Sequence, residues 1–234
     1  MPPIVLCVEQ QPTAPLARLG PLLAQAGVEV RVAPAPDGLD DDDLEQHSGV
    51  VVLGGEMGCH DAAEFPWLTD EFALIQKAHE QRVPVLGICL GGQLVAQALG
   101  GRVLAGACHE IGWFEAELLM DDRLLGPRAV AEQFLWHSDA FELPPGAEAL
   151  VSGRIPGRAP LAFRSGTSYG FQFHPEVTPE LVAGWVASDD GELAELGVNG
   201  SDLVAATALH DRQYERQARR IAEGFAALIA ARRH

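Results

Sequence analysis

The residues with the clearest chemical potential lie in the segment GICLGG, where Cys89 stands between a short apolar run and a helical pattern. Gly87 precedes the cysteine by two positions, and Gly91 follows it by two. A G-x-C-x-G turn of this kind projects a nucleophile from a sharp strand-to-helix bend, because small neighbours tolerate unusual backbone angles. The helix that follows favours the thiolate, and the N–H of Leu90 is placed to donate to an oxyanion. The turn predicts a nucleophilic Cys89, with a buried structural cysteine as the alternative.

A thiol nucleophile requires a base, and the segment FQFHPE offers one. His174 ends a strand-like run and Glu176 follows two positions later, a spacing that sends both side chains the same way on an extended backbone. Glu176 then holds one ring nitrogen of His174 while the other nitrogen faces the sulfur of Cys89. A second assignment follows the nucleophile–acid–histidine order of α/β hydrolases, in which Asp139 orients His174. The acid that bonds His174 distinguishes the two assignments.

The elements that must position these residues begin with valine-rich apolar runs separated by helical patterns, which predict strands of a parallel sheet. Strand–helix alternation of this kind is typical of an α/β fold with right-handed crossovers. The expected strands cover residues 3–8, 28–33, 49–55 and 83–88, and the expected helices cover residues 14–27, 66–82 and 90–101.

The second half of the chain has a different pattern, with strand-like segments joined by turn residues. We expect these segments to be antiparallel or mixed strands that extend the sheet, at residues 112–118, 132–138, 160–166 and 168–176. From Thr178 the pattern is helical, with Pro179 at a first turn and one or two amphipathic helices over residues 201–234.

Composition excludes several classes of protein. The 234 residues carry 16 basic and 33 acidic side chains, a net charge of −17, which argues against nucleic acid or an anionic membrane as a partner. No apolar stretch reaches the ~18 residues of a membrane span, and the amino-terminal residues lack the basic region of a secretory signal. The four cysteines are scattered, so we expect a cytoplasmic protein without a disulfide framework.

Taken together, these segments resemble the class I glutamine amidotransferases, which use a Cys-His-Glu triad. GICLGGQ resembles the nucleophile segment of that family, FQFHPE its His-Glu segment, and VVLGGEMG its glycine-rich oxyanion loop. EIGW, WHSDAFELPPGAEAL and the helical tail resemble a stand-alone branch related to the amidotransferase subunit of GMP synthase. The resemblance implies a flavodoxin-like, three-layer α/β fold with an amidotransferase domain at residues 1–177 and a packed helical extension at residues 178–234.

The resemblance also implies a mechanism without a cofactor. Glutamine binds with its side-chain amide beside Cys89, the thiolate forms a γ-glutamyl thioester with release of ammonia, and water activated by His174 frees glutamate. The N–H groups of Gly55 and Leu90 hold the oxyanion.

Substrate contacts are implied at five positions. Gln93 and the backbone at Ser138 and Asp139 hold the α-amino and α-carboxylate ends of glutamine, and Gly54 and Glu56 belong to the oxyanion loop. The family usually has proline where this chain has Glu56, so the rigidity of the loop and the charge beside the site are in question.

Three functions remain open at this point. The chain lacks a G-x-x-x-x-G-K-[ST] phosphate loop, so it does not activate an acceptor with ATP by itself. It is either an ammonia-donating component that meets a separate synthetase, or a stand-alone γ-glutamyl hydrolase or peptidase. The third possibility is a catalytically silent binding module on an amidotransferase scaffold.

Other notable side chains receive simpler interpretations. The pairs Cys59-His60 and Cys108-His109 do not have the spacing of a structural zinc site, so we expect no metal. The run Asp40–Asp43 indicates a solvated loop or helix start, and His137 is either a support for the substrate site or a satisfied strand-end histidine. Core or packing positions are expected for Trp67, Trp113, Trp136 and Trp185.

Overall fold

A seven-stranded sheet forms the centre of the molecule, seen here in a computed structural model that describes residues 2–39, 43–153 and 159–232. The strand order is β2-β1-β3-β4-β11-β10-β9. The first five strands in this order run parallel, and β10 pairs antiparallel with both β11 and β9. The predicted α/β fold with a mostly parallel sheet and an antiparallel extension is therefore confirmed. The strands are β1 (Ile4–Glu9), β2 (Glu29–Pro34), β3 (Gly49–Val52), β4 (Val85–Ile88), β9 (Glu148–Val151), β10 (Ala162–Ser165) and β11 (Ser168–Phe171).

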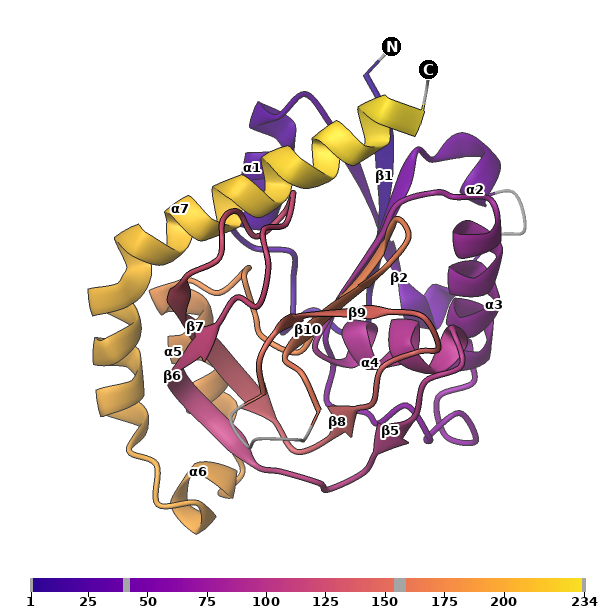
Figure 1. Cartoon of the computed structure of the whole chain (residues 1–234). Helices are drawn as coiled ribbons and strands as arrows, with labels where there is room; N and C mark the ends of the chain where they lie inside the picture. Colours follow the sequence, from indigo (N-terminus) through magenta and orange to yellow (C-terminus); the bar gives the residue numbers. More distant parts are fainter. Residues whose placement is uncertain (1, 40–42, 154–158, 233–234) are drawn as a thin grey trace.

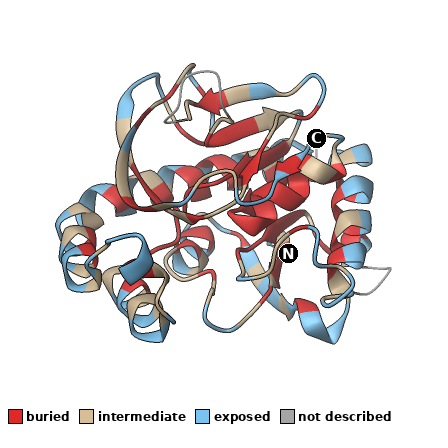
Figure 2. Cartoon of the chain, turned by 90° about the horizontal axis from the view of Figure 1, so that it is seen from below, coloured by how far each residue is buried: buried red, intermediate tan, exposed pale blue. Residues whose placement is uncertain are grey.

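Helices cover both faces of this sheet because alternate strand residues point to opposite sides. Val5 and Cys7 join a core with α1 (Leu19–Gln25) and α7 (Gly200–Arg232). Leu6 and Val8 face the other way and join a second core with α3 (Trp67–Glu80) and α4 (Leu90–Ala98). Figure 1 shows the resulting three layers, and Figure 2 shows buried residues gathered in the middle of the molecule, with exposed residues on the outer helices.

Two of the predicted strands do not extend the central sheet. The segments expected at residues 112–118 and 132–138 form β6 (Glu110–Glu117) and β7 (Val130–His137), which pair with each other as a separate antiparallel ribbon. One part of this ribbon packs against the carboxyl-terminal helices, where Ile111 and Phe134 share a core with Tyr214 of α7. The far edge of the central sheet is formed instead by β9, a strand that was not predicted.

The remaining elements are short. The pair β5 (Val103–Leu104) and β8 (Ala140–Phe141) forms a second two-stranded ribbon. A 3-10 turn, η1 (Ala35–Asp37), precedes α2 (Asp43–Gln46). Within the run Asp40–Asp43, residues 40–42 lie outside the described residues, and Asp43 begins α2.

The carboxyl-terminal part is helical, as predicted. Thr178 caps α5 (Pro179–Ser188) by accepting the N–H of Leu181 at 3.2 Å, and α6 (Glu192–Glu195) follows. The tail then forms one 33-residue helix, α7, which contacts both α5 and α1. An ion pair of 2.6 Å between Arg18 and Asp211 also joins α7 to the residue before α1. The division at residue 177 stays a prediction.

Among the described residues, no helix combines the length and the hydropathy that a bilayer span requires.

Glycines allow the amino end of α4 to approach the central strands closely. A Cβ atom on Gly91 would overlap the carbonyl oxygen of Val52 in β3, and one on Gly92 would overlap that of Phe171 in β11. One on Gly87 would overlap the carbonyl of Gly91. Side chains at these positions would push α4 away from the sheet.

This close approach predicts a large effect of one methyl group. Gly91→Ala should lower the free energy of unfolding by about 2–3 kcal/mol, because the backbone of β3 must move. Gly184→Ala is the matched control: it is also helical, and a Cβ there meets no atom within 4 Å, so we expect no loss and a gain of up to about 1 kcal/mol. Denaturant titration measures both, and equal effects would contradict this account of the packing.

Candidate active site

Cys89 occupies a strained position between β4 and α4. Its φ of 52° and ψ of −112° lie in a region that non-glycine residues rarely adopt. The surrounding backbone fixes this conformation: the N–H of Cys89 donates to the carbonyl of Phe171 at 2.7 Å, and its own carbonyl accepts the N–H of Gln93 at 3.0 Å. The sharp turn expected from the glycine spacing is present, with the thiol at the amino end of a helix.

His174 and Glu176 form the hydrogen-bonded pair expected from their spacing. Nδ1 of His174 lies 2.7 Å from Oε1 of Glu176, and both side chains are buried. The local reason differs from the predicted one, because β11 ends at Phe171 and the chain then bends and turns. A turn therefore brings the two side chains together, and a hydrogen bond of 3.0 Å from the His174 N–H to the carbonyl of Phe134 anchors that turn to β7.

Asp139 makes a different contact from the one that the hydrolase-like assignment requires. Its Oδ1 accepts the N–H of Gly106 at 2.8 Å. Glu176, by contrast, is in direct contact with His174. The geometry thus favours the Cys89–His174–Glu176 arrangement as the triad to propose.

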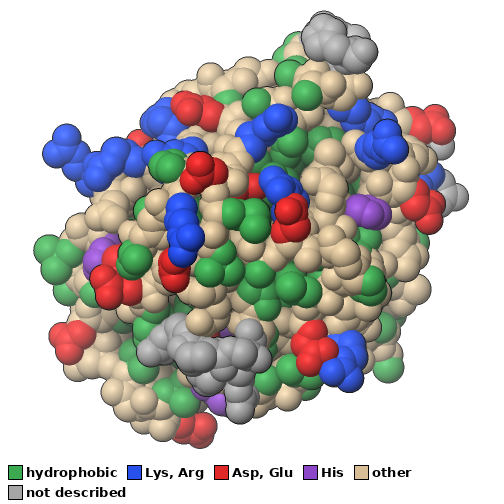
Figure 3. Space-filling model, in the orientation of Figure 1, with side chains coloured by type: hydrophobic (Ala, Val, Ile, Leu, Met, Phe, Trp, Pro, Cys, Tyr) green, Lys and Arg blue, Asp and Glu red, His purple; other side chains and the backbone are tan. Residues whose placement is uncertain are grey.

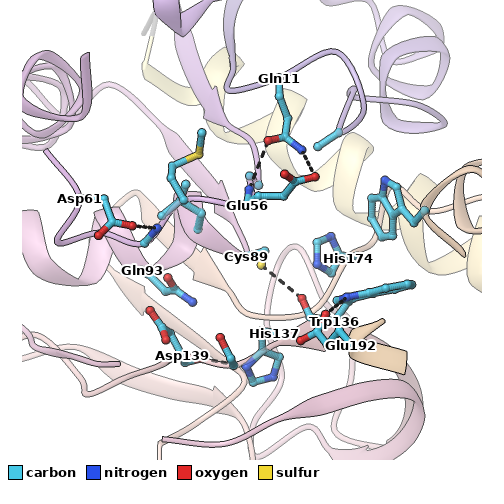
Figure 4. A pocket seen from close by; sticks show the side chains of 18 of the residues that line it. Gln11, Glu56, Asp61, Cys89, Gln93, Trp136, His137, Asp139, His174 and Glu192 are labelled. Atoms are coloured by element: carbon cyan, nitrogen blue, oxygen red, sulfur yellow. Dashed lines mark hydrogen bonds between the residues drawn. The ribbon is translucent and has the colours of Figure 1, made fainter. Parts of the chain in front are cut away.

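The imidazole of His174 is electrostatically coupled to the groups around it. Burial alone would lower the pKa of His174, but the negative charges at Glu176 and at the Cys89 sulfur outweigh it and raise the pKa well above its usual value. Nε2 of His174 is buried and has no aligned hydrogen-bond partner among the described residues, and Figure 4 shows the ring beside the Cys89 sulfur. The Cys89 thiol donates to the carbonyl of Trp136 at 3.7 Å. A proton acceptor and a nucleophile therefore share one site.

A cavity of about 650 Å³ opens over Cys89 and His174. Glu176 is not among the residues that line it, which fits a position behind the imidazole. The remaining sequence-predicted residues all line this cavity, namely Gly54, Gly55, Glu56, Leu90, Gln93, Ser138 and Asp139. Their individual roles stay predictions.

The loop after β3 brings backbone close to the thiol and the imidazole. A Cβ atom on Gly54 would lie 3.4 Å from Cβ of Cys89 and 3.5 Å from Cε1 of His174. One on Gly55 would lie 2.5 Å from Sδ of Met57, so a side chain there would displace its neighbour. The two glycines thus let main-chain groups, rather than side chains, face the reacting atoms.

Glu56 is held in place by a side chain from the segment after β1. Nε2 of Gln11 donates to Oε1 of Glu56 at 3.1 Å, and the N–H of Glu56 donates to Oε1 of Gln11 at 3.3 Å. This reciprocal pair, visible in Figure 4, restrains the loop at the position where the resemblance had implied proline. Unlike proline, it leaves a carboxylate at the cavity.

The side chain of Gln93 is buried, and it contacts other buried side chains as well as the cavity. Its Nε2 donates to Oε1 of Gln172 at 3.4 Å, and Gln172 in turn donates to the sulfur of Cys89 at 3.8 Å. Cys59 donates to Oε1 of Gln93 at 3.9 Å. The Gln93 amide is therefore also a buried support for the nucleophile.

Two of the tryptophans expected at core or packing positions, Trp136 and Trp185, pack against a core cluster and also line the cavity. The ring centroid of Trp185 lies 5.1 Å from that of His174 and 5.7 Å from that of Trp136. Trp136 adjoins the predicted substrate residues Ser138 and Asp139, which was a usable sequence signal. Trp185 had none, because it belongs to a tail helix whose placement depends on packing. Sequence reasoning also missed the cavity residues Gln11, Asp189, Asp190 and Glu192.

Comparison with known proteins decides the family. The family model described as glutamine amidotransferase class-I matches residues 19–183, well over half of the chain.

The chain belongs to the class I glutamine amidotransferase family.

Individual relatives agree with this assignment. The chain is 30% identical to a subunit of the glutamine-hydrolyzing GMP synthase from Thermococcus kodakarensis over 165 residues, which covers 68% of this chain and 82% of that relative. It is 34% identical to the glutamine-hydrolyzing GMP synthase of Aquifex aeolicus over 132 residues, or 56% of this chain. The chain spans only 24% of that longer protein.

Solved structures match over nearly the whole length. A glutamine amidotransferase from Thermotoga maritima superposes with a TM-score of 0.87 at 27% identity, covering 97% of this chain and 99% of that one. A glutamine amido transferase from Methylobacillus flagellatus gives a TM-score of 0.85 at 26% identity, covering 97% and 95%. The helical tail of this amidotransferase is therefore included in the structural match.

Beside the amidotransferase site, His137 lies in a cluster with Cys108 and Glu110. Their ligand atoms all lie within 4.8 Å of one another, which makes this the one metal-like cluster found among the described residues. Nδ1 of His137 donates to the carbonyl of Asp139 at 2.8 Å, and Nε2 lies 3.2 Å from Oε2 of Glu110. Both ring nitrogens are thus engaged without a metal, although the contact with Glu110 is a close ion pair rather than an aligned hydrogen bond.

Contacts with Cys108 and Glu110 together keep His137 protonated. Burial lowers the pKa of His137, but contacts with Cys108, Glu110 and the Asp139 carbonyl raise it overall to about 9. His137 is buried, and the carbonyl that it holds belongs to a residue lining the cavity. The protonated imidazole therefore supports the segment that faces Cys89.

The pairing of His137 with Glu110 predicts a pH-dependent stability. The folded-state pKa of about 9 exceeds the ordinary value of 6.5, so the stabilisation is fully present below about pH 6.5 and is lost as the pH rises through about 9. Glu110→Gln should therefore be less stable than the wild type at pH 6.5, and the difference in unfolding free energy should shrink by on the order of 2 kcal/mol by pH 10. Denaturant titrations at both pH values test this, and a pH-independent difference would refute it.

Proposed function

We propose that this chain hydrolyses the side-chain amide of glutamine through a γ-glutamyl thioester on Cys89, releasing ammonia and glutamate. The observation that carries the proposal is one constellation: a thiol at a strained helix start, with a buried imidazole beside it that Glu176 holds at 2.7 Å. Membership of the amidotransferase family supports glutamine hydrolysis, and the GMP synthase relatives are named as glutamine-hydrolyzing.

The first half of the reaction forms the thioester. The Cys89 thiolate attacks the amide carbon, and the electron pair of the carbonyl moves to oxygen. The C–N bond then breaks as His174 gives its Nε2 proton to the departing nitrogen, so that ammonia leaves. Glu176 stabilises the protonated ring and sets its orientation.

The second half regenerates the enzyme. His174 now takes a proton from water, which attacks the thioester carbon, and glutamate leaves as the thiolate departs. In both halves the oxyanion is proposed to receive the N–H groups of Gly55 and Leu90. Each such donor is worth ~2.7–4 kcal/mol of transition-state stabilisation.

Two more specific functions remain alternatives, and they differ in what leaves when the amide bond breaks. The Thermococcus relative is named as one subunit of its synthase, and the chain spans about a quarter of the full-length Aquifex synthase. Both observations support an ammonia-donating chain that meets a separate synthetase. In the alternative, the chain acts alone as a γ-glutamyl hydrolase or peptidase. Both share the thioester chemistry and differ in the amine that leaves.

Removal of the thiol tests the proposed nucleophile. Cys89→Ala should abolish glutamate release from glutamine and should leave the unfolding transition in place, because only one sulfur is lost. Cys7→Ala is the matched control, since Cys7 is a buried cysteine of β1 that does not line the cavity, and it should retain activity. Full activity in Cys89→Ala would overturn the mechanism.

The choice of orienting acid is tested by a pair of isosteric changes. Glu176→Gln should lower kcat on the order of 10²–10⁴-fold, because the amide no longer stabilises the protonated imidazole. Asp139→Asn should have a smaller effect, since Asp139 accepts a backbone N–H instead. The reverse order, measured by steady-state glutamate release, would favour the hydrolase-like assignment. Inactivity of the wild type on all γ-glutamyl amides would favour a silent binding module.

A further inference from the structure

The cavity over Cys89 is lined by carboxylates. Among its described lining residues six are acidic, and none is lysine or arginine. Carboxylates are ionised near neutral pH, so these side chains give the cavity a negative potential, which low-dielectric walls focus. The six are Glu56, Asp61, Asp139, Asp189, Asp190 and Glu192.

These carboxylates are held by N–H donors, which fix them without cancelling their charge. Oε2 of Glu192 accepts the indole N–H of Trp136 at 3.0 Å, and Oδ2 of Asp61 accepts the N–H of Gly58 at 2.7 Å. Asp189 accepts two backbone N–H groups, at 3.1 and 3.2 Å.

Elsewhere in the molecule the pattern is different. Arg164 lies 2.9 Å from the buried Asp122, and Figure 3 shows acidic and basic side chains next to one another at several places on the surface. Among the described residues no lysine or arginine pairs with a cavity carboxylate, and the imidazoles of His137 and His174, which also line the cavity, are paired with Glu110 and Glu176 instead. The charge of the cavity carboxylates is therefore available to a ligand.

The carboxylates come from walls on different sides of the thiol. Glu56 belongs to the loop after β3, whereas Asp189 and Asp190 belong to the segment that joins α5 to α6, and Glu192 is the first residue of α6. Figure 4 shows Glu56 and Glu192 on different sides of Cys89. Under the proposed function, Gln93, Ser138 and Asp139 take the amino-acid end of the substrate, which leaves the Glu56 and 189–192 walls for the departing amine.

The cavity also has room for more than ammonia at that end. Its volume of about 650 Å³ lies in the range of pockets that take drug-sized ligands. Glutamine as a zwitterion has no net charge and gains little from a negative wall. A γ-glutamyl amide with an ammonium group on its amine portion gains directly from it.

We propose that the preferred substrates are γ-glutamyl amides whose leaving amine is a cation, such as a diamine or polyamine. This inference rests on the proposed function and specifies its substrate class. The distal ammonium contacts the carboxylates of Glu56 and of the 189–192 segment while Cys89 attacks the amide carbon. His174 protonates the nitrogen of the breaking C–N bond, the free amine leaves with its distal charge unchanged, and water hydrolyses the thioester to glutamate.

A matched series of substrates tests the preference on the full chain. The probes are γ-glutamyl amides of 1,4-diaminobutane, butylamine and 4-aminobutyrate, which are of similar length and carry a positive, a neutral and a negative end. Glutamine is assayed in parallel, and glutamate release gives kcat/KM for each. We expect the cationic amide to exceed the neutral one by 10-fold or more at low salt, the anionic amide to be poorest, and the differences to narrow as salt is added.

Isosteric variants test whether the carboxylates of the cavity walls cause the preference for the cationic amide. Glu56→Gln and Glu192→Gln should each reduce the ratio of kcat/KM for the cationic over the neutral amide, and the double variant should reduce it further than either single variant. Glutamine at position 192 still accepts the Trp136 N–H, so the change removes charge while keeping that acceptor. Glu195→Gln, an exposed position on the same short helix, should leave the ratio unchanged.

The outcomes separate this inference from the proposed function. Hydrolysis of glutamine and the neutral amide without a preference for the cationic amide would overturn the inference alone. A preference that is undiminished in the double variant would also overturn it, because removal of two wall charges would then have no effect. Hydrolysis of none of the four compounds would overturn the proposed function, and the inference with it.

Discussion

The contact between the amino end of α4 and the central strands is the constraint on which the site depends. Three glycines around Cys89 let the helix backbone lie against the carbonyls of β3 and β11, where a methyl group has no space. This approach forces Cys89 to a positive φ and directs its sulfur out of the turn. It also places the helix start beside the loop after β3, so the thiol and the main-chain donors proposed for the oxyanion are positioned by one packing event.

His174, the proposed base, is positioned beside Cys89 by a different set of elements. His174 sits in a turn after β11, which is hydrogen-bonded to β7 through the carbonyl of Phe134, and its ring packs against Trp185 of α5. The ribbon of β6 and β7 contributes Trp136, whose carbonyl accepts the Cys89 thiol. The groups around the thiol thus come from the carboxyl ends of the central strands, from the ribbon and from the tail. Their mutual distances depend on how these three parts pack together.

Local sequence patterns were sufficient to predict the parallel strands of the central sheet, the turn at Cys89 and the pairing of His174 with Glu176. Glycine spacing around Cys89 has one good structural solution, and short valine-rich runs between turn residues indicate buried strands. The ribbon was assigned to the wrong sheet because strand pairing is a non-local property that alternation does not encode. Trp185 and the 189–192 acids were missed for the same reason: their place at the cavity is set by the packing of α5, and a single tryptophan or aspartate in a helical tail has no chemical signature. The predicted contact between His174 and Glu176 is present. The prediction assumed an extended backbone at these residues, whereas the structure has a turn there.

The boundary of the family match falls between two groups of residues at the site. The model of the family ends at residue 183, so the thiol, the base and its acid lie inside the shared region, whereas Trp185, Asp189, Asp190 and Glu192 lie beyond it. The proposed catalytic groups and one acidic wall of the cavity therefore lie in different stretches of the chain. Substitutions in the tail can change the charge of that wall without altering the thiol, the imidazole or the carboxylate that holds it.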